Sequence, residues 1–424
     1  MKGKSLTDKI LHFTPSWFAV IMGTGVVGIL IFNLPFGDQG IRTTVASAFL
    51  ILNIVIFMTF LLASIARYAL FPQIWMLMIH EPIQSLFLGC FPMALATIIS
   101  ATVSISLVHT RLRSLIMFLW GLWWFDLALS FASCILLPYI MITRHRILWE
   151  HHNATWLLPV VPPIVAASCG AILASALIDS NPEKARITVA ASCASLAVGL
   201  SVSMMIITTY LFRLFAHGFP AAGLVVSVLV PLGPCGQGGY ALLLLSKHFN
   251  TLISGLGVEE ALYGKIAIAL ATAGALTLWS IGSWLGIIAA LGLVEATYTS
   301  KIHFRVNFWG MVFPLGVYSL LTIQLGHELN LQFFRICGTI LSAITGLLWL
   351  GISSKTVYLA FDGTIFIAPC LDDKPHIRPW FNASPKYTKD EPGANGTSDM
   401  ENAQEETAHT EEHGVVRNAQ ETKQ

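Results

Sequence analysis

The chain has 424 residues, of which 55% are hydrophobic and only 11% charged, and its formal net charge is +1. Soluble domains carry about 25% charged residues. Together with a mean hydropathy of +0.70, this composition excludes an ordinary soluble protein and predicts an all-α, polytopic membrane protein. Nothing in the composition indicates a nucleic-acid partner, and the lipid bilayer is the first expected partner.

Ten apolar stretches are each long enough to cross a bilayer, which takes about 20 residues. The predicted helices cover residues 15–34, 45–66, 85–108, 115–139, 156–178, 187–212, 221–245, 261–294, 308–325 and 333–358. Residues 1–14 are predicted to be a cytoplasmic N-terminal segment, and residues 15–360 a ten-helix transport domain. Residues 371–424 are rich in acidic and other polar residues without apolar periodicity, which predicts a disordered acidic tail.

The odd-numbered predicted helices carry prolines near mid-span, at Pro92, Pro162, Pro231 and Pro314. The intervals between these prolines are 70, 69 and 83 residues. Backbone broken by proline is tolerated in a membrane where it faces protein or a water-filled path. The pattern therefore predicts five helical hairpins in a pseudo-fivefold ring around a central pore, with the kinked helices inside. The alternative is that membrane helices simply contain more proline.

Lysine and arginine near the span ends give a weak prediction of orientation. Ten lie on the side of the N-terminus and eight on the opposite side, which favours cytoplasmic termini. Three glycosylation sequons, at Asn153, Asn382 and Asn395, then face the cytoplasm, and a glycan on any of them would reverse this orientation.

The seventh predicted helix contains the glycine- and proline-rich stretch Pro231–Gly239. A helix broken there would present backbone N–H groups that suit a small anion, and Gln237 would add a neutral donor. The stretch lacks the Gly-Lys-Ser/Thr ending of a nucleotide-binding loop. The alternative is a site of tight helix packing, which small residues permit.

The kinked helices contain few charges, which suits passage of a small anion rather than tight binding. An aromatic side chain beside a kink could plug such a path or could be ordinary packing. The predicted path residues are Ser16, Thr24, Phe91, Pro92, Ser168, Pro231, Gly233, Gln237, Pro314 and Gly316.

Asp126 is a carboxylate inside a predicted span, where ionisable groups are costly. Structural pairing is the preferred interpretation, and proton or substrate handling is the alternative. His145, His151 and His152 form one loose cluster, which we interpret as loop histidines rather than the metal site of a membrane oxidase. No metal or other cofactor is expected, and the seven cysteines are predicted to be small packing residues.

Several motifs resemble the tellurite-resistance/dicarboxylate transporter family, which includes the plant slow anion channels. Within it, the motifs are most similar to those of fungal plasma-membrane sulfite efflux pumps. The motifs are Phe13–Trp17, Met22–Gly25, Phe91–Met93, Leu122–Asp126, Pro163–Gly170, Leu232–Gly238 and Phe308–Gly316.

The resemblance implies a ring of five helical hairpins around a pore, a homotrimer, and a transporter or channel rather than an enzyme. It also implies that Phe313, on the ninth helix, takes the position of the phenylalanine that plugs the pore in the channels. Sulfite or bisulfite is the implied substrate, and the alternative is malate or another dicarboxylate, because malate carriers share the architecture.

Overall fold

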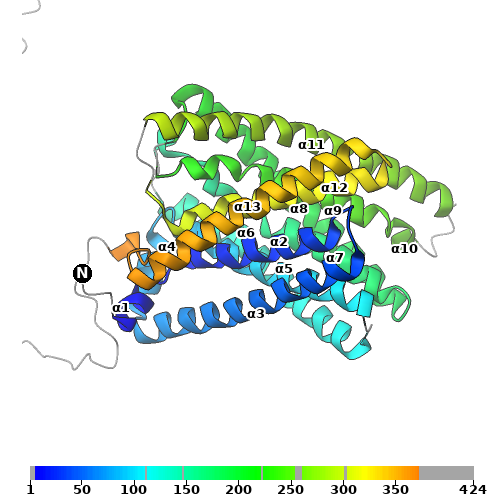
Figure 1. Cartoon of the computed structure of the whole chain (residues 1–424), viewed down its shortest axis with the longest axis horizontal. Helices are drawn as coiled ribbons and strands as arrows, with labels where there is room; N and C mark the ends of the chain where they lie inside the picture. Colours follow the sequence, from blue (N-terminus) through cyan, green and yellow to red (C-terminus); the bar gives the residue numbers. More distant parts are fainter. Residues whose placement is uncertain are drawn as a thin grey trace, which may run out of the picture. The chain divides into compact units, whose positions relative to one another are not determined.

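The computed structural model describes residues 5–109, 112–145, 148–220, 223–253, 260–299 and 303–371, and these are folded into helices without any strand. Figure 1 shows long helices lying side by side, so the predicted all-α fold class is confirmed. The predicted acidic tail lies, except for Leu371, outside the described residues.

Five long helices expose most of their apolar surface: α3 (Gln39–Leu70), α6 (Arg113–Arg144), α8 (Pro182–His217), α11 (Glu260–Thr299) and α13 (Gln332–Asp362). In their most apolar stretches only 11–33% of the residues are buried. Large side chains such as Ile51 and Leu270 are 65% and 69% exposed. Surfaces of this kind are stable in contact with lipid, so these are the outer helices.

Five shorter helices are instead buried: α2 (Phe18–Asn33), α5 (Cys90–His109), α7 (Pro162–Leu177), α9 (Leu232–Ser246) and α12 (Val312–Glu328). With the turns that precede them, the spans containing α2, α5, α9 and α12 are 78–89% buried. Nine helices of the described residues are long and apolar enough to cross a membrane, and α7 is apolar but has only 16 residues. The expected fifth span, 156–178, is thus only partly α-helical.

A 3₁₀ segment precedes each inner helix: η1 (Pro15–Trp17), η2 (Ser85–Gly89), η4 (Ala154–Leu157), η5 (Val225–Leu229) and η6 (Val306–Met311). Four inner helices then carry proline in their first turn, at Pro92, Pro162, Pro234 and Pro314. The first N–H groups of an α-helix have no intrahelical partner, so proline costs little there. The expected break inside Pro231–Gly239 is therefore wrong: α9 runs unbroken from Leu232, and the irregular backbone comes before it.

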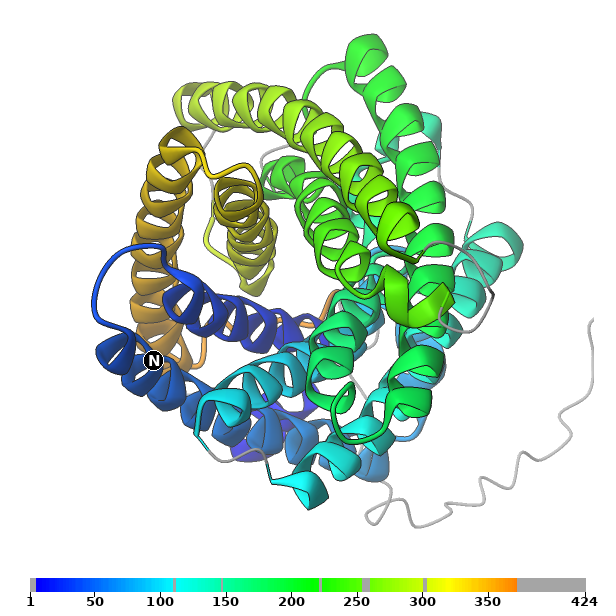
Figure 2. The ribbon, with the colours of Figure 1, turned by 90° about the vertical axis from the view of Figure 1, so that its right-hand side faces the viewer.

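The inner helices contact one another in the closed order α2, α5, α7, α9, α12 and back to α2. Each also packs against the outer helix that follows it along the chain. Figure 2, which looks along the helices, shows the inner helices surrounded by the outer ones. The contacts between α9 and α12 are very close, because a Cβ added to Gly236 would lie 2.5 Å from the backbone nitrogen of Tyr318.

Short helices mark the two ends of the bundle (Figure 1). α1 (Leu6–Leu11) and α4 (Gln73–His80) lie at one end, where α13 also finishes, and α10 (Phe249–Ile253) lies at the other. The smaller turns η3 (Trp149–His151) and η7 (Pro369–Leu371) complete the described elements. We call the two ends the α1 end and the α10 end.

Candidate anion pathway

Two small cavities lie between the inner helices, and all five inner segments line both of them. Each holds about 20 Å³, which is room for roughly one water molecule. On each inner segment, a residue that lines one cavity is followed about seven positions later by a residue that lines the other. Met93 and Ser100 on α5 are one such pair, and Gly233 and Tyr240 on α9 are another. Seven helical residues rise about 10 Å, so the cavities follow one another along the bundle.

The cavity nearer the α1 end is the apolar chamber, lined by side chains such as Met22, Met93, Val161 and Val230. Gly233 and Pro314, two of the predicted path residues, also line it. None of the lining residues carries a charge, so a hydrated ion entering this chamber must give up most of its water.

The cavity nearer the α10 end is the polar chamber, where Thr97, Ser100, Ser168, Gln237 and Tyr240 meet. The Gln237 amide donates a hydrogen bond to the Ser168 hydroxyl, which in turn donates to the Val165 carbonyl at 2.9 Å. The Thr97 hydroxyl donates to the Ala94 carbonyl at 2.7 Å. These groups are neutral donors and acceptors that can replace part of an ion's hydration without holding it tightly.

Phe313 lines both chambers, and its side chain is only 3% exposed. It is the second residue of α12, immediately before Pro314. Phe313 is thus a lining residue that the two cavities share.

A larger cavity of about 280 Å³ opens at the α1 end, and we call it the vestibule. Phe87 lines both the vestibule and the apolar chamber. Ser16, a predicted path residue, lines the vestibule, and its hydroxyl lies 2.6 Å from that of Thr14. The apolar chamber therefore lies next to the vestibule, with which it shares Phe87, and next to the polar chamber, with which it shares Phe313.

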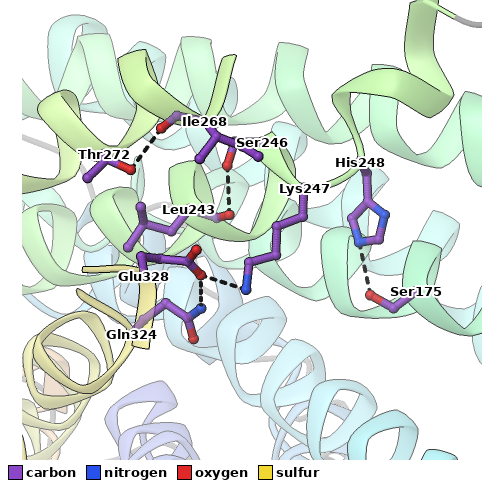
Figure 3. A network of polar contacts seen from close by, with 9 residues as sticks. All are labelled: Ser175, Leu243, Ser246, Lys247, His248, Ile268, Thr272, Gln324 and Glu328. Atoms are coloured by element: carbon purple, nitrogen blue, oxygen red, sulfur yellow. Dashed lines mark hydrogen bonds and ion pairs between the residues drawn. The ribbon is translucent and has the colours of Figure 1, made fainter. Parts of the chain in front are cut away.

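An ion pair joins two inner segments at the α10 end (Figure 3). Lys247, directly after α9, places its Nζ 2.6 Å from a carboxylate oxygen of Glu328 on α12, and the Gln324 amide donates to the same oxygen at 2.7 Å. His248 shares a hydrogen bond of 2.9 Å with Ser175. Burial and the nearby Lys247 charge lower the pKa of His248.

Other predicted path residues lie in helix contacts rather than along these cavities. The Thr24 hydroxyl accepts a hydrogen bond from Trp349 of the outer helix α13 at 3.1 Å. The Phe91 ring packs edge-on against Phe18 and also contacts Phe57. A Cβ at Gly316 would meet Val26 of α2 at 2.7 Å.

Pro92 and Pro231 are also buried, and neither is among the residues that line the chambers.

Asp126 is fully buried on α6, and neither carboxyl oxygen has a hydrogen-bond partner among the described residues. The structure therefore brings no donor to it, and Asp126 lines neither chamber.

The histidines of the 145–152 stretch do not come together as a metal site, since the described residues contain no group of three His, Cys, Asp or Glu side chains placed to bind one. His145 is bonded through Nε2 to the Ile79 carbonyl at 3.0 Å. His152 is 1% exposed and stacks on Trp149, with Trp156 edge-on to it. Burial and the nearby Arg213 lower the pKa of His152 to about 4.

Sequence reasoning missed Ser100 and Tyr240 in the polar chamber, and Gln84 and Arg305 in the vestibule. The first two could have been found by counting seven residues on from Met93 and Gly233. The other two lie in connecting segments, where no periodicity indicates which way a side chain faces.

Comparison with known proteins fits this geometry. Residues 12–357 match the family described as SLAC1, voltage-dependent anion channel. The sulfite efflux pump SSU1 of Trichophyton rubrum is 36% identical over 359 residues, covering 84% of this chain and 93% of that protein. The sulfite efflux pump SSU1 of Candida albicans is 26% identical over 382 residues, with 84% and 76% covered.

A relative named for a different substrate matches a similar share of this chain. The malic acid transport protein of Schizosaccharomyces pombe is 22% identical over 351 residues, covering 81% of this chain and 78% of that protein. The family match covers most of the chain, including every inner helix, and confirms the resemblance seen in the motifs. The chain therefore belongs to the SLAC1 family of anion channels and transporters, and it is a multi-pass membrane transport protein rather than an enzyme.

Proposed function

We propose that the protein exports sulfite, as a small singly charged anion, across the plasma membrane through the sequence of spaces between its inner helices. The observation that carries the proposal is the position of Phe313, which lines both chambers. Phe313 is the gate of this pathway, and displacement of its ring joins the apolar chamber to the polar one.

The proposed architecture is ten membrane-crossing helices arranged as five hairpins in a pseudo-fivefold ring around a central pore. The closed order of contacts among α2, α5, α7, α9 and α12 supports it, as does the packing of each inner helix on its following outer helix. In this arrangement α7 and the η4 turn that precedes it together form the remaining crossing, in addition to the nine longer helices.

The size and charge of the chambers favour a small anion. Each chamber has room for roughly one water molecule, and none of the described residues that line them is a lysine or arginine. First-turn residues of α5, α9 and α12 line the apolar chamber, and helix N-termini carry partial positive charge. An anion is thus favoured over a cation without a fixed charge that would hold it.

Malate or another dicarboxylate is the second candidate, and the likeness to a malic acid transport protein favours it. The cost of removing an ion from water rises steeply with its charge. A doubly charged malate would have to cross the apolar chamber with no cationic side chain to compensate for the lost hydration. The free energy of dehydration is much smaller for a singly charged anion.

We further propose that the protein is a homotrimer with both termini in the cytoplasm. Residues 1–14 are then a cytoplasmic segment, residues 15–360 the transport domain, and residues 371–424 a cytoplasmic tail. The vestibule in this orientation receives anions from the cytoplasm, as export requires.

Flux into proteoliposomes tests the substrate. Purified full-length protein is reconstituted, and uptake of sulfite is compared with uptake of malate at equal concentration, with protein-free vesicles as the background. We expect sulfite to enter much faster than malate. Malate flux without sulfite flux would contradict sulfite export and favour the second candidate.

A further inference from the structure

The vestibule contains polar side-chain groups that have no partner among the described residues. Gln84 is 4% exposed, and neither its amide nitrogen nor its amide oxygen makes a hydrogen bond within the described residues. Leaving a buried amide unpaired costs the free energy of removing that group from water without a compensating hydrogen bond. A buried, unpaired amide on the wall of a cavity indicates a position where a ligand or water supplies the missing partner.

A cationic group lines the same cavity. Arg305 is the residue before η6, and its backbone carbonyl accepts a hydrogen bond from the Phe308 N–H at 3.1 Å. Its side chain makes no hydrogen bond or ion pair with any described residue. Guanidinium groups offer five N–H donors in a planar fork that matches the oxygens of an oxyanion.

The acidic residue of the vestibule is already engaged. A carboxylate oxygen of Glu81 accepts hydrogen bonds from the backbone N–H groups of Ile83, at 3.0 Å, and Gln84. Glu81 forms no ion pair with Arg305 within the described part of the chain. The arginine therefore remains available to an incoming anion.

The vestibule lies where an anion entering the proposed pathway would lose its water. The vestibule, at about 280 Å³, has room for an anion with part of its water shell, whereas the next chamber has room for roughly one water. An anion must be dehydrated where the two spaces meet, beside Phe87. Donors that replace water at that point lower the cost of entering the apolar chamber.

We propose that the vestibule is a loading site in which Arg305 and Gln84 bind a small oxyanion before it enters the apolar chamber. This deepens the proposed function and rests on it for the direction of transport. Arg305 supplies the charge, and the Gln84 side-chain amide supplies a hydrogen bond to an anion oxygen. Thr14 and Ser16 line the same cavity.

The test is the dependence of flux on sulfite concentration in proteoliposomes, together with titration calorimetry of sulfite into the detergent-solubilised full chain. The variants are Arg305→Gln and Gln84→Leu, and the matched control is Lys355→Gln, which removes one positive charge from α13 without touching the vestibule. Hydrogen bonds to charged groups contribute about 1.5–3 kcal/mol. We expect both vestibule variants to weaken binding and raise half-saturation about tenfold or more, with little change in maximal flux, and Lys355→Gln to match wild type.

Arg305→Lys separates a binding site from a diffuse positive charge. Lysine keeps the charge but loses the planar fork, so we expect it to restore only part of the affinity. Full restoration would reduce Arg305 to electrostatic attraction and contradict direct binding. Unchanged half-saturation in both Arg305→Gln and Gln84→Leu, in protein that elutes as folded by gel filtration, would overturn the loading site.

The proposed substrate and the proposed loading site are tested by different results. If wild-type vesicles carry malate but not sulfite, sulfite export is contradicted, and the same variants are then compared with malate as the probe. A rise in half-saturation for malate would support the site, and no rise would overturn it.

Discussion

His152 is a buried imidazole whose environment makes the stability of the protein depend on pH. Its ring stacks on Trp149 and meets Trp156 edge-on, and its pKa is lowered to about 4 by burial and by Arg213. The unfolded chain, with an ordinary histidine pKa near 6.5, binds a proton at a higher pH than the folded protein. Stability is therefore fully present above about pH 6.5 and falls as the pH drops towards about 4.

Thermal unfolding of the detergent-solubilised protein at several pH values between 7.5 and 4.5 measures this effect. We expect His152→Gln to reduce the fall in melting temperature over that range. His151→Gln is the matched control, because His151 is exposed, with 69% of its side chain accessible, and it should retain the wild-type dependence. Equal pH dependence in all three proteins would contradict a neutral, buried His152.

For single residues, the sequence predicts which polar side chains the inner helices contain better than it predicts which way those side chains face. Ser168 and Gln237 were both expected on the path, and the structure joins them by a hydrogen bond although they are 69 positions apart. Thr24 was expected there too but is bonded to the outer helix α13. Inner helices are apolar on every side, so their periodicity does not indicate which side faces a cavity.

At the scale of elements, α9 and α12 approach so closely that glycine is required at position 236. A Cβ there would lie 2.5 Å from the Tyr318 nitrogen, which is fixed backbone rather than a movable side chain. We expect Gly236→Ala to destabilise the protein by about 1–3 kcal/mol, as overpacking does, and to lower its melting temperature.

Gly351→Ala on α13 is the control, because a Cβ there meets nothing within 4 Å. Alanine favours helix by roughly 0.5–1 kcal/mol over glycine, so this variant should be as stable as wild type or slightly more stable. Equal melting temperatures for Gly236→Ala and wild type would mean that the two helices can move apart without cost.

The Lys247–Glu328 pair joins the ends of two inner segments at the α10 end (Figure 3), the end nearer the polar chamber. Its two charges should act on a passing anion in opposite ways. We expect Glu328→Gln to raise anion flux and Lys247→Gln to lower it, each by roughly fivefold, since a unit charge at about 4 Å contributes about 1 kcal/mol in water.

Flux assays with Lys265→Gln, a charge removal on the outer helix α11, give the control, and this variant should behave as wild type. The alternative is that the Lys247–Glu328 pair only stabilises the contact between the ends of α9 and α12 and does not act on the anion. In that case Lys247→Gln and Glu328→Gln would change flux in the same direction, together with a loss of thermal stability.

The elements themselves were largely predictable, because lipid thickness sets the length of an apolar helix. The break in the seventh predicted helix was misplaced, however, by attributing it to the glycines of Pro231–Gly239. Proline within the first turn does not break a helix, as Pro234 in α9 illustrates. The 3₁₀ segments have no distinctive sequence pattern, so they could not be separated from the helices that follow them.

At the scale of the whole molecule, the proline intervals correctly indicate which helices are buried. The orientation in the membrane depends on a small difference in charge between the two sides and remains a prediction. Asn153, one of the sequons, is 3% exposed, and its side-chain oxygen accepts a hydrogen bond from the Thr155 backbone at 3.1 Å. A glycan there is incompatible with this fold, and the sequons at Asn382 and Asn395 lie outside the described residues.

The central claim is that anions pass through two chambers separated by the Phe313 ring. Phe91 offers a matched control, because it is another phenylalanine beside a proline but packs against Phe18 and Phe57 and lines neither chamber. Phe91→Ala should lower stability while leaving the flux per folded molecule close to wild type.

The most direct measurement is therefore sulfite flux per folded molecule in proteoliposomes containing wild type, Phe313→Ala or Phe91→Ala. Removal of the Phe313 ring joins the chambers, so the account predicts a several-fold increase in flux for Phe313→Ala alone. Wild-type flux in folded Phe313→Ala protein would contradict it and leave Phe313 as a packing residue.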